Sequence, residues 1–147
     1  MPATAFLDPR GGLKDLAAGI LRADIEDNLS DDPLRLLRAF RIAAQLGLSI
    51  EQKTLKAISR RKKLISVPAS ERVTAELLML LAVPGVPAWL GLMDECGLLT
   101  AIFPELEPSR RCAEDYYGPG GVLKHTLDVC ARVDFLLTNL RAIYPGL

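Results

Sequence analysis

One stretch, "DDPLRLLRAFRIAAQLG" at residues 31–47, constrains the fold most because it carries signals for both ends of a helix. Asp32 is a favoured N-cap residue, and Pro33 is tolerated at the first helical position, where its missing N–H costs little. Gly47 is of the type that ends helices in the left-handed conformation. The spacing therefore predicts a helix over 33–46.

Three arginines lie at intervals of three along this helix, at Arg35, Arg38 and Arg41. Every third helical residue is rotated by only about 60° from the last, so the three share one face. The opposite face is apolar, which indicates that it packs against a core.

The remaining pattern predicts short amphipathic helices divided by proline and glycine. They fall at about 50 or 51 to 62, at 66–83 with Ser66 or Ser70 as the cap, within 88–99 as a short helix closed by Gly97, and at 122–144. In the third helix the apolar stripe comprises Val73, Leu77, Leu78, Leu80 and Leu81. Residues 109–121 are predicted to be a loop. The fold class is therefore all-α, a multi-helical array of short helices.

A single β-strand is predicted near the N-terminus, in "GILRADI" at residues 19–25. No second strand pattern is evident to pair with it. We expect a short orphan strand whose partner lies outside this chain.

The charge and cysteine patterns exclude several classes of protein. The 147 residues carry 18 Lys and Arg against 18 Asp and Glu, so bulk charge predicts neither a DNA nor a membrane partner. Residues 1–65 are nevertheless basic, with 12 Lys and Arg against 8 Asp and Glu. The three cysteines form no C-x-x-C pair, and no apolar run reaches the roughly 18 residues of a membrane span. A cytoplasmic protein with reduced thiols is expected.

No complete active site is evident. The sequence lacks a G-x-x-x-x-G-K-[ST] phosphate loop, a G-x-S-x-G elbow, an H-E-x-x-H motif and a D-x-D carboxylate pair. Its one histidine, His125, cannot form a multi-histidine metal site. We expect no catalytic residue, no metal and no bound cofactor in this chain.

Base recognition is one chemistry that the motif at 31–35 can perform. Asp32 offers an acceptor and Arg35 a donor, and adenine and cytosine present a complementary donor and acceptor on their Watson–Crick edges. Guanine and uracil present the reverse order, and each unpaired buried group costs about 1–3 kcal/mol. From these residues alone, the simpler alternative is a capped helix with a surface ion pair worth under about 1 kcal/mol.

Five segments within residues 8–106 together resemble a known family. They read, in order, "DPRGGLKDL", "LRAD", "LSDDPLRLLRAFRIAAQLGLSIEQKTLKAI", "ISVPASERVTAELLMLLA" and "LGLMDECGLLTAIFPEL". This succession resembles the middle of the class II nucleotidyltransferases, which comprise the bacterial tRNA nucleotidyltransferases, or CCA-adding enzymes, and the bacterial poly(A) polymerases.

The resemblance implies roles for individual residues. "DDPLR" is similar to the family's EDxxR motif, so Asp32 and Arg35 are expected to read the base of incoming ATP or CTP. Arg38 matches a frequent second arginine near the sugar or phosphates. Asp31 stands where the family has Glu and is expected to support the site.

Two further motifs carry structural expectations. "DPRGGLKDL" resembles the family's hinge between the catalytic head and the neck, which places the hinge at Asp8, Gly11, Gly12 and Asp15. "SERVTAEL" resembles a neck helix in which Glu71, Arg72 and Glu76 pair the helices together.

The resemblance also implies an organisation in parts. Residues 1–29 would form the head–neck junction, 30–107 the helical neck and body, and 108–147 a linker and the start of an HD-like region with His125 in "GVLKHTLDVC". The family's catalytic head has no counterpart here. It is an expected partner, on the same or a separate chain, and Mg²⁺ is expected only with it.

Two interpretations follow for the role of the chain. The first is a nucleotide- and RNA-binding part of an RNA 3′-end processing enzyme, with ATP, CTP and tRNA or another RNA 3′ end as partners. The second is a stand-alone helical module that binds RNA or protein. If the chain binds RNA, the phosphate contacts are expected at the basic run Arg60, Arg61, Lys62 and Lys63. The alternative is a solvated helix end in which these cations only interact with the carbonyl end of the helix.

Overall fold

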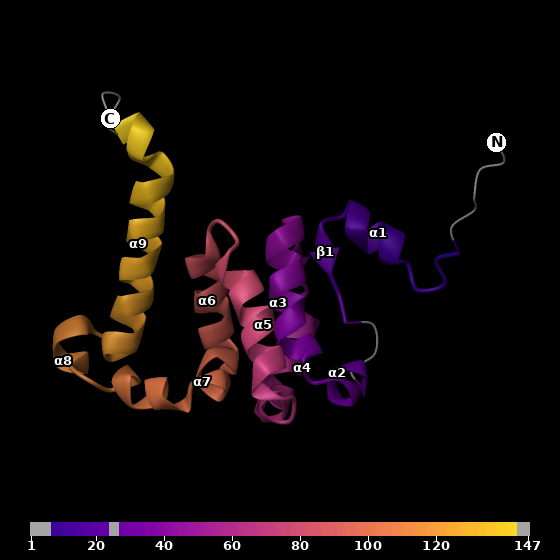
Figure 1. Ribbon diagram of the computed structural model, residues 1–147, viewed down its shortest axis with the longest axis horizontal. Coiled ribbons are helices and arrows are strands. Elements are labelled where there is room, and N and C mark those ends of the chain that lie inside the picture. The colour runs from indigo at the N-terminus through magenta and orange to yellow at the C-terminus, as the bar shows by residue number, and fades with distance from the viewer. Residues whose placement is uncertain (1–6, 24–26, 144–147) are drawn as a thin grey trace.

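A computed structural model describes residues 7–23 and 27–143. Within these residues the elements are α1 (Gly12–Ala17), β1 (Ile20–Leu21), α2 (Asp27–Asp31), α3 (Arg35–Leu46), β2 (Ser49–Ile50), α4 (Gln52–Arg61), η1 (Lys62–Ser66), α5 (Ser70–Leu81), α6 (Val86–Glu95), α7 (Leu98–Ile102), η2 (Pro104–Arg110), α8 (Glu114–Tyr117) and α9 (Gly121–Ile143). They form an elongated array with α3 to α7 in the middle, α1 and β1 at one end, and α8 and α9 at the other (Figure 1). The predicted all-α class is confirmed.

Helix α3 ends as predicted. Gly47 has φ 66° and ψ 31°, and the backbone N–H groups of Gly47 and Leu48 both donate to the carbonyl of Ala43. A residue with a Cβ is disfavoured in this left-handed conformation, which explains why the helix stops at a glycine.

The start of α3 differs from the prediction. The helix begins at Arg35, after a turn in which the Asp32 carbonyl accepts the Arg35 N–H at 2.9 Å, and no side chain caps it. The Asp32 carboxylate instead accepts a hydrogen bond from Arg38 at 3.3 Å. Asp32 is therefore not an N-cap, because its carboxylate is taken by a guanidinium.

The inner face of α3 forms the centre of the hydrophobic core. Leu36, Leu37, Phe40 and Ala43 are completely buried there. The face packs against α5 and α6, with Leu80, Met93 and Leu98 among its fully buried neighbours in the core. Burying each large apolar side chain contributes about 1.5–3 kcal/mol, so this face anchors the array.

The strand predicted in residues 19–25 exists and is paired. β1 runs parallel to β2, with Ile20 opposite Ser49 and Leu21 opposite Ile50. The N–H groups of Ser49 and Glu51 donate to the carbonyls of Gly19 and Leu21 at 2.8 and 3.0 Å. The prediction of an orphan strand was wrong, because the two residues of β2 are too few to show a pattern in sequence.

Four other expectations need correction. α2 was not predicted, and α8 lies within the segment expected to be a loop. α5 begins after Ala69 without a side-chain cap, and the Ser66 hydroxyl donates instead to the Lys63 carbonyl at 2.9 Å. Leu78 and Leu81 are 62% and 43% exposed, so the apolar stripe of α5 is narrower than predicted.

In the described residues, no helix is both long and apolar enough to cross a membrane.

A buried carboxylate joins α5 to α3. Glu76 is 5% exposed, and its two carboxylate oxygens accept hydrogen bonds from Nε of Arg38 at 2.7 Å and Nε of Arg41 at 2.6 Å. Burial alone would raise the pKa of Glu76, but the hydrogen bonds from Arg38 and Arg41 outweigh it and hold the pKa below its ordinary value. The ion pairs expected of this helix are therefore present at Glu76.

We expect Glu76→Gln to lower the free energy of unfolding by about 1–3 kcal/mol, because two arginines lose a charged partner in a buried interface. Urea denaturation at pH 7 measures the change. Glu71→Gln is the matched control, since Glu71 is exposed on the first turn of the same helix and should change stability by less than about 0.5 kcal/mol. Equal stability of the Glu76 variant and the wild type would contradict the assigned role.

The lowered pKa of Glu76 also predicts a pH dependence. The unfolded state binds the proton first as pH falls, so the contribution of Glu76 is complete above its ordinary pKa of about 4.3 and is lost as pH falls through the lower folded pKa. The difference in unfolding free energy between wild type and Glu76→Gln should therefore be constant from pH 7 to about 5.5 and shrink below about 4. A difference independent of pH would rule out an ionised Glu76 as its source.

Candidate functional site

A pocket of about 420 Å³ lies where β1, α2, α3 and α4 meet. Its lining residues are Leu21, Arg22, Ala23, Asn28, Leu29, Arg35, Arg38, Ala39, Ile42 and Thr54. Most of its exposed surface is apolar, and the polar lining residues are three arginines, Asn28 and Thr54. An apolar pocket with a few convergent polar groups is the usual form of a small-molecule site.

The backbone around the pocket is held by Thr54 on α4. Its buried hydroxyl oxygen accepts the N–H of Ala23 at 2.9 Å and ties the segment that follows β1 to α4. The pairing of β1 with β2 continues this link. Residues separated by about thirty positions are thereby fixed on one side of the pocket.

Asp32 lies among three arginines beside the pocket. Its carboxylate is 3.3 Å from Nη1 of Arg38, 4.0 Å from Nε of Arg35 and 3.8 Å from Nη2 of Arg72. At 4.0 Å, the Arg35 Nε–H and the nearest Asp32 oxygen are neighbours that do not form a hydrogen bond with each other. The pair therefore presents a donor beside an acceptor, as the sequence predicts, although Asp32 itself does not line the pocket.

Arg35 is oriented by α2. Its Nη1 donates to the Asn28 carbonyl at 3.0 Å, and its side chain remains 46% exposed. A guanidinium has five N–H donors, so this bond leaves most of them for other acceptors. α2, which was not predicted, is therefore the element that directs Arg35.

Arg38 is oriented by α5. The hydrogen bond to Glu76 raises the pKa of Arg38 above its ordinary value, and the nearby Asp32 adds to the effect. The Arg38 guanidinium is therefore charged at neutral pH. Asp31, expected to support the site, is exposed at the end of α2 and is not among the pocket residues.

Arg22 is a pocket residue that the sequence analysis missed. It forms a two-point ion pair with Asp15, with both N···O distances at 2.9 Å, and its Nη1 is 3.6 Å from a carboxylate oxygen of Glu51. The only signal in the sequence was its place in "LRAD", directly after the strand. Its position depends on the pairing of β1 with β2, which was not predicted.

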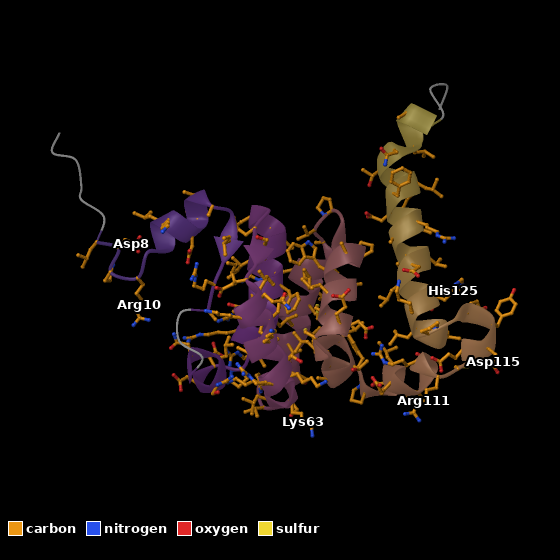
Figure 2. The ribbon with its side chains drawn as sticks, turned by 180° about the vertical axis from the view of Figure 1, so that it is seen from behind. Asp8, Arg10, Lys63, Arg111, Asp115 and His125 are labelled. Carbon is orange, nitrogen blue, oxygen red and sulfur yellow. The ribbon has the colours of Figure 1, made fainter. Side chains whose placement is uncertain are left out.

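The four predicted hinge residues lie around α1. The carboxylate of Asp8 accepts the N–H groups of Gly12 and Leu13 at 2.7 and 2.9 Å, and Gly11 has φ 73°. Asp15 connects α1 to β1 through Arg22. Asp8 lies at the end of the molecule opposite His125 (Figure 2). Whether this segment acts as a hinge remains a prediction.

The basic run is divided by the structure. Arg60 and Lys63 are exposed, whereas Arg61 and Lys62 are partly buried. Nε of Arg61 donates to the Ser30 hydroxyl at 3.1 Å, and the Lys62 side chain lies against Gly97. The four residues therefore do not form one surface.

His125 lies on the first part of α9, far from the pocket (Figure 2). Its ring stacks on Tyr117 with centroids 4.2 Å apart and an interplanar angle of 26°. Within the described residues, no group of three His, Cys, Asp or Glu side chains is placed to hold a metal ion. An HD-like region beginning here remains a prediction.

Comparisons with known proteins match parts of this chain. Residues 47–110 match a family model described as the probable RNA and SrmB-binding site of polymerase A. A multifunctional CCA protein from Neisseria gonorrhoeae is 37% identical over 104 residues, which cover 69% of this chain and 25% of the relative. An A-adding tRNA nucleotidyltransferase from Deinococcus radiodurans is 32% identical over 128 residues, which cover 84% of this chain and 30% of the relative.

A solved structure of a CCA-adding enzyme in complex with ATP has the same fold over this region. The TM-score is 0.64 at 25% identity, with 71% of this chain and 26% of the enzyme covered. The chain thus spans about a quarter of the length of the curated relatives it matches. The family model over residues 47–110, the relatives of 32–37% identity and the common fold show that this chain is similar to part of the tRNA nucleotidyltransferases.

Proposed function

We propose that this chain recognises the base of ATP or CTP and binds RNA in an enzyme that adds C and A to RNA 3′ ends without a template. The observation that carries the proposal is the Asp32–Arg35 pair beside an apolar pocket of about 420 Å³. A similar region occurs in a CCA-adding enzyme solved with ATP, which supports a nucleotide as the ligand.

The chemistry of the pair explains selection among nucleotides. The Asp32 carboxylate would accept the exocyclic amino group of adenine or cytosine, while Arg35 would donate to N1 or N3. Guanine and uracil would place a carbonyl against the carboxylate and a ring N–H against the guanidinium. Each mismatch costs about 1–3 kcal/mol, or about 5- to 150-fold in affinity.

The surrounding residues provide the remaining contacts in this proposal. The apolar walls at Leu21, Leu29 and Ile42 suit the faces of a base, and Arg38 is charged and close enough to the pocket to meet a sugar or phosphate. Asp31 is retained only as a supporting residue, since it is exposed and outside the pocket.

Catalysis is assigned to a head domain on the same or a separate chain, where Mg²⁺ would be bound. This assignment is supported by the length of the matched relatives, which are about four times as long as the aligned region. tRNA or another RNA 3′ end is the proposed substrate, and the cytoplasm the proposed location. The chain's own contribution is binding and orientation of the nucleotide.

RNA binding without nucleotide recognition is the second candidate. It is favoured by the family model, whose match at residues 47–110 does not include Asp32 or Arg35. The two candidates differ in one result, because only the first predicts that ATP and CTP bind better than GTP and UTP.

We expect the wild-type chain to bind ATP and CTP more tightly than GTP and UTP, and Arg35→Ala to lower ATP and CTP affinity by about 5- to 150-fold. The loss follows from removing the donor that faces N1 or N3. Ligand-observed NMR titration with the four nucleotides detects this even at millimolar affinity.

Arg111→Ala is the matched control, since Arg111 is exposed and far from the pocket (Figure 2). It removes the same charge and should leave the preference unchanged. Equal binding of all four nucleotides by the wild type would favour the second candidate over base recognition.

A further inference from the structure

We propose that Lys53, Lys56, Arg60 and Lys63 form a track for the sugar-phosphate backbone of RNA along the outer face of α4 and η1. We call these four residues the α4 basic stripe. The inference rests on the RNA-binding part of the proposed function and specifies the surface that performs it. It replaces the consecutive run Arg60–Lys63 as the expected site of phosphate contact.

The spacing of the stripe places its members on one face. They follow one another at intervals of three, four and three residues, the intervals at which side chains of a helix lie side by side. All four are exposed, and Lys63 projects from the edge of the molecule (Figure 2). The buried residues of α4 are Thr54, Ala57 and Ile58, which lie on the face turned to the core.

The chain segment that carries the stripe has charges of one sign, although Glu95 of α6 lines the same pocket as Lys56. Residues 52–70 contain six Lys and Arg and no Asp or Glu. None of the ion pairs found among the described residues includes Lys53, Lys56 or Lys63. Cations elsewhere, such as Arg72 and Arg110, lie within ion-pair distance of carboxylates. The three lysines therefore keep their charge available for an external anion.

The inward members of the basic run act as supports for the stripe. Arg61 contacts Ser30 on α2, and Lys62 lies against Gly97, at the start of α7. η1 also packs against α7. These contacts fix the end of α4, so the stripe lies on a rigid element.

The dimensions fit a nucleic-acid strand. The ten residue steps from Lys53 to Lys63 span about 15 Å at 1.5 Å per residue. A stacked strand carries one phosphate per roughly 3.4 Å, so the stripe faces about four nucleotides. Point charges on flexible stems suit phosphates without selecting a base sequence.

The test is the salt dependence of RNA binding by the whole chain. A fluorescein-labelled RNA hairpin with a single-stranded 3′ end is titrated by anisotropy between 50 and 200 mM KCl. Each phosphate contact contributes about 0.7–0.9 to the slope of log affinity against log salt. In Lys53→Gln/Lys56→Gln/Lys63→Gln the slope should therefore fall by about 2.1 to 2.7, which removes about 20- to 40-fold of the affinity loss over this range. Arg60 is left unchanged because it makes further contacts.

The control is Lys14→Gln/Arg111→Gln/Arg132→Gln, which removes three exposed cations from other elements and should leave the slope unchanged. Each single lysine variant should lower the slope by a little under one, which keeps the test valid if the triple variant does not fold. Equal effects of the stripe and control variants would overturn the proposal, as would salt-insensitive or absent RNA binding by the wild type.

Two further results separate this inference from its alternatives. Stripe-dependent binding to phosphatidylserine vesicles, with RNA binding unaffected by the variants, would overturn it in favour of a membrane surface. The preference for ATP and CTP is measured without RNA, so its failure would leave the stripe result standing, and failure of the stripe would leave base recognition standing.

Discussion

The buried carboxylate of Glu76 is the interaction on which the arrangement of the site depends. A charge removed from water in a helix interface is costly unless it is paired and hydrogen-bonded. Glu76 meets this condition with two arginines of α3, at 2.7 and 2.6 Å, and it thereby fixes how α3 lies on α5. The first of these bonds holds Arg38, whose Nη1 also reaches Asp32 at 3.3 Å. One carboxylate therefore links the packing of α3 on α5 to the positions of Arg38 and Asp32.

This coupling explains why α3 serves the core and the pocket together. Its inner residues Leu36, Leu37 and Phe40 are completely buried, so the helix cannot rotate without exposing them. Arg35 and Arg38 are consequently held at the wall of the pocket, and Asn28 and Glu76 select where each guanidinium points. A donor beside an acceptor distinguishes bases only when both are fixed, since mobile side chains would adjust to guanine as readily as to adenine.

The parts of this arrangement that follow from local chemistry were predictable from sequence, and those that depend on distant partners were not. The end of α3 was predicted because Gly47 adopts a conformation that few other residues tolerate. The start was misplaced because Asp32, a good cap by type, pairs with Arg38 instead. β2 was missed since its two residues are defined only by hydrogen bonds to a strand about thirty positions away, and the place of Arg22 in the pocket was missed with it. Asp32 and Arg35 lie 4.0 Å apart, as their spacing in the sequence predicts, whereas their role in base recognition was expected from the resemblance and stays a prediction.

The basic residues illustrate the same distinction at the surface. Four consecutive cations attract notice in a sequence, yet successive helical residues are rotated by about 100°, so such a run must point in several directions. Arg61 and Lys62 accordingly turn toward Ser30 and Gly97, while Arg60 and Lys63 face solvent. Residues three and four apart share a face, which joins Lys53 and Lys56 to the two exposed members of the run. An extended polyanion interacts with charges that are adjacent on the surface, so the relevant pattern is the helical period and not the length of the run.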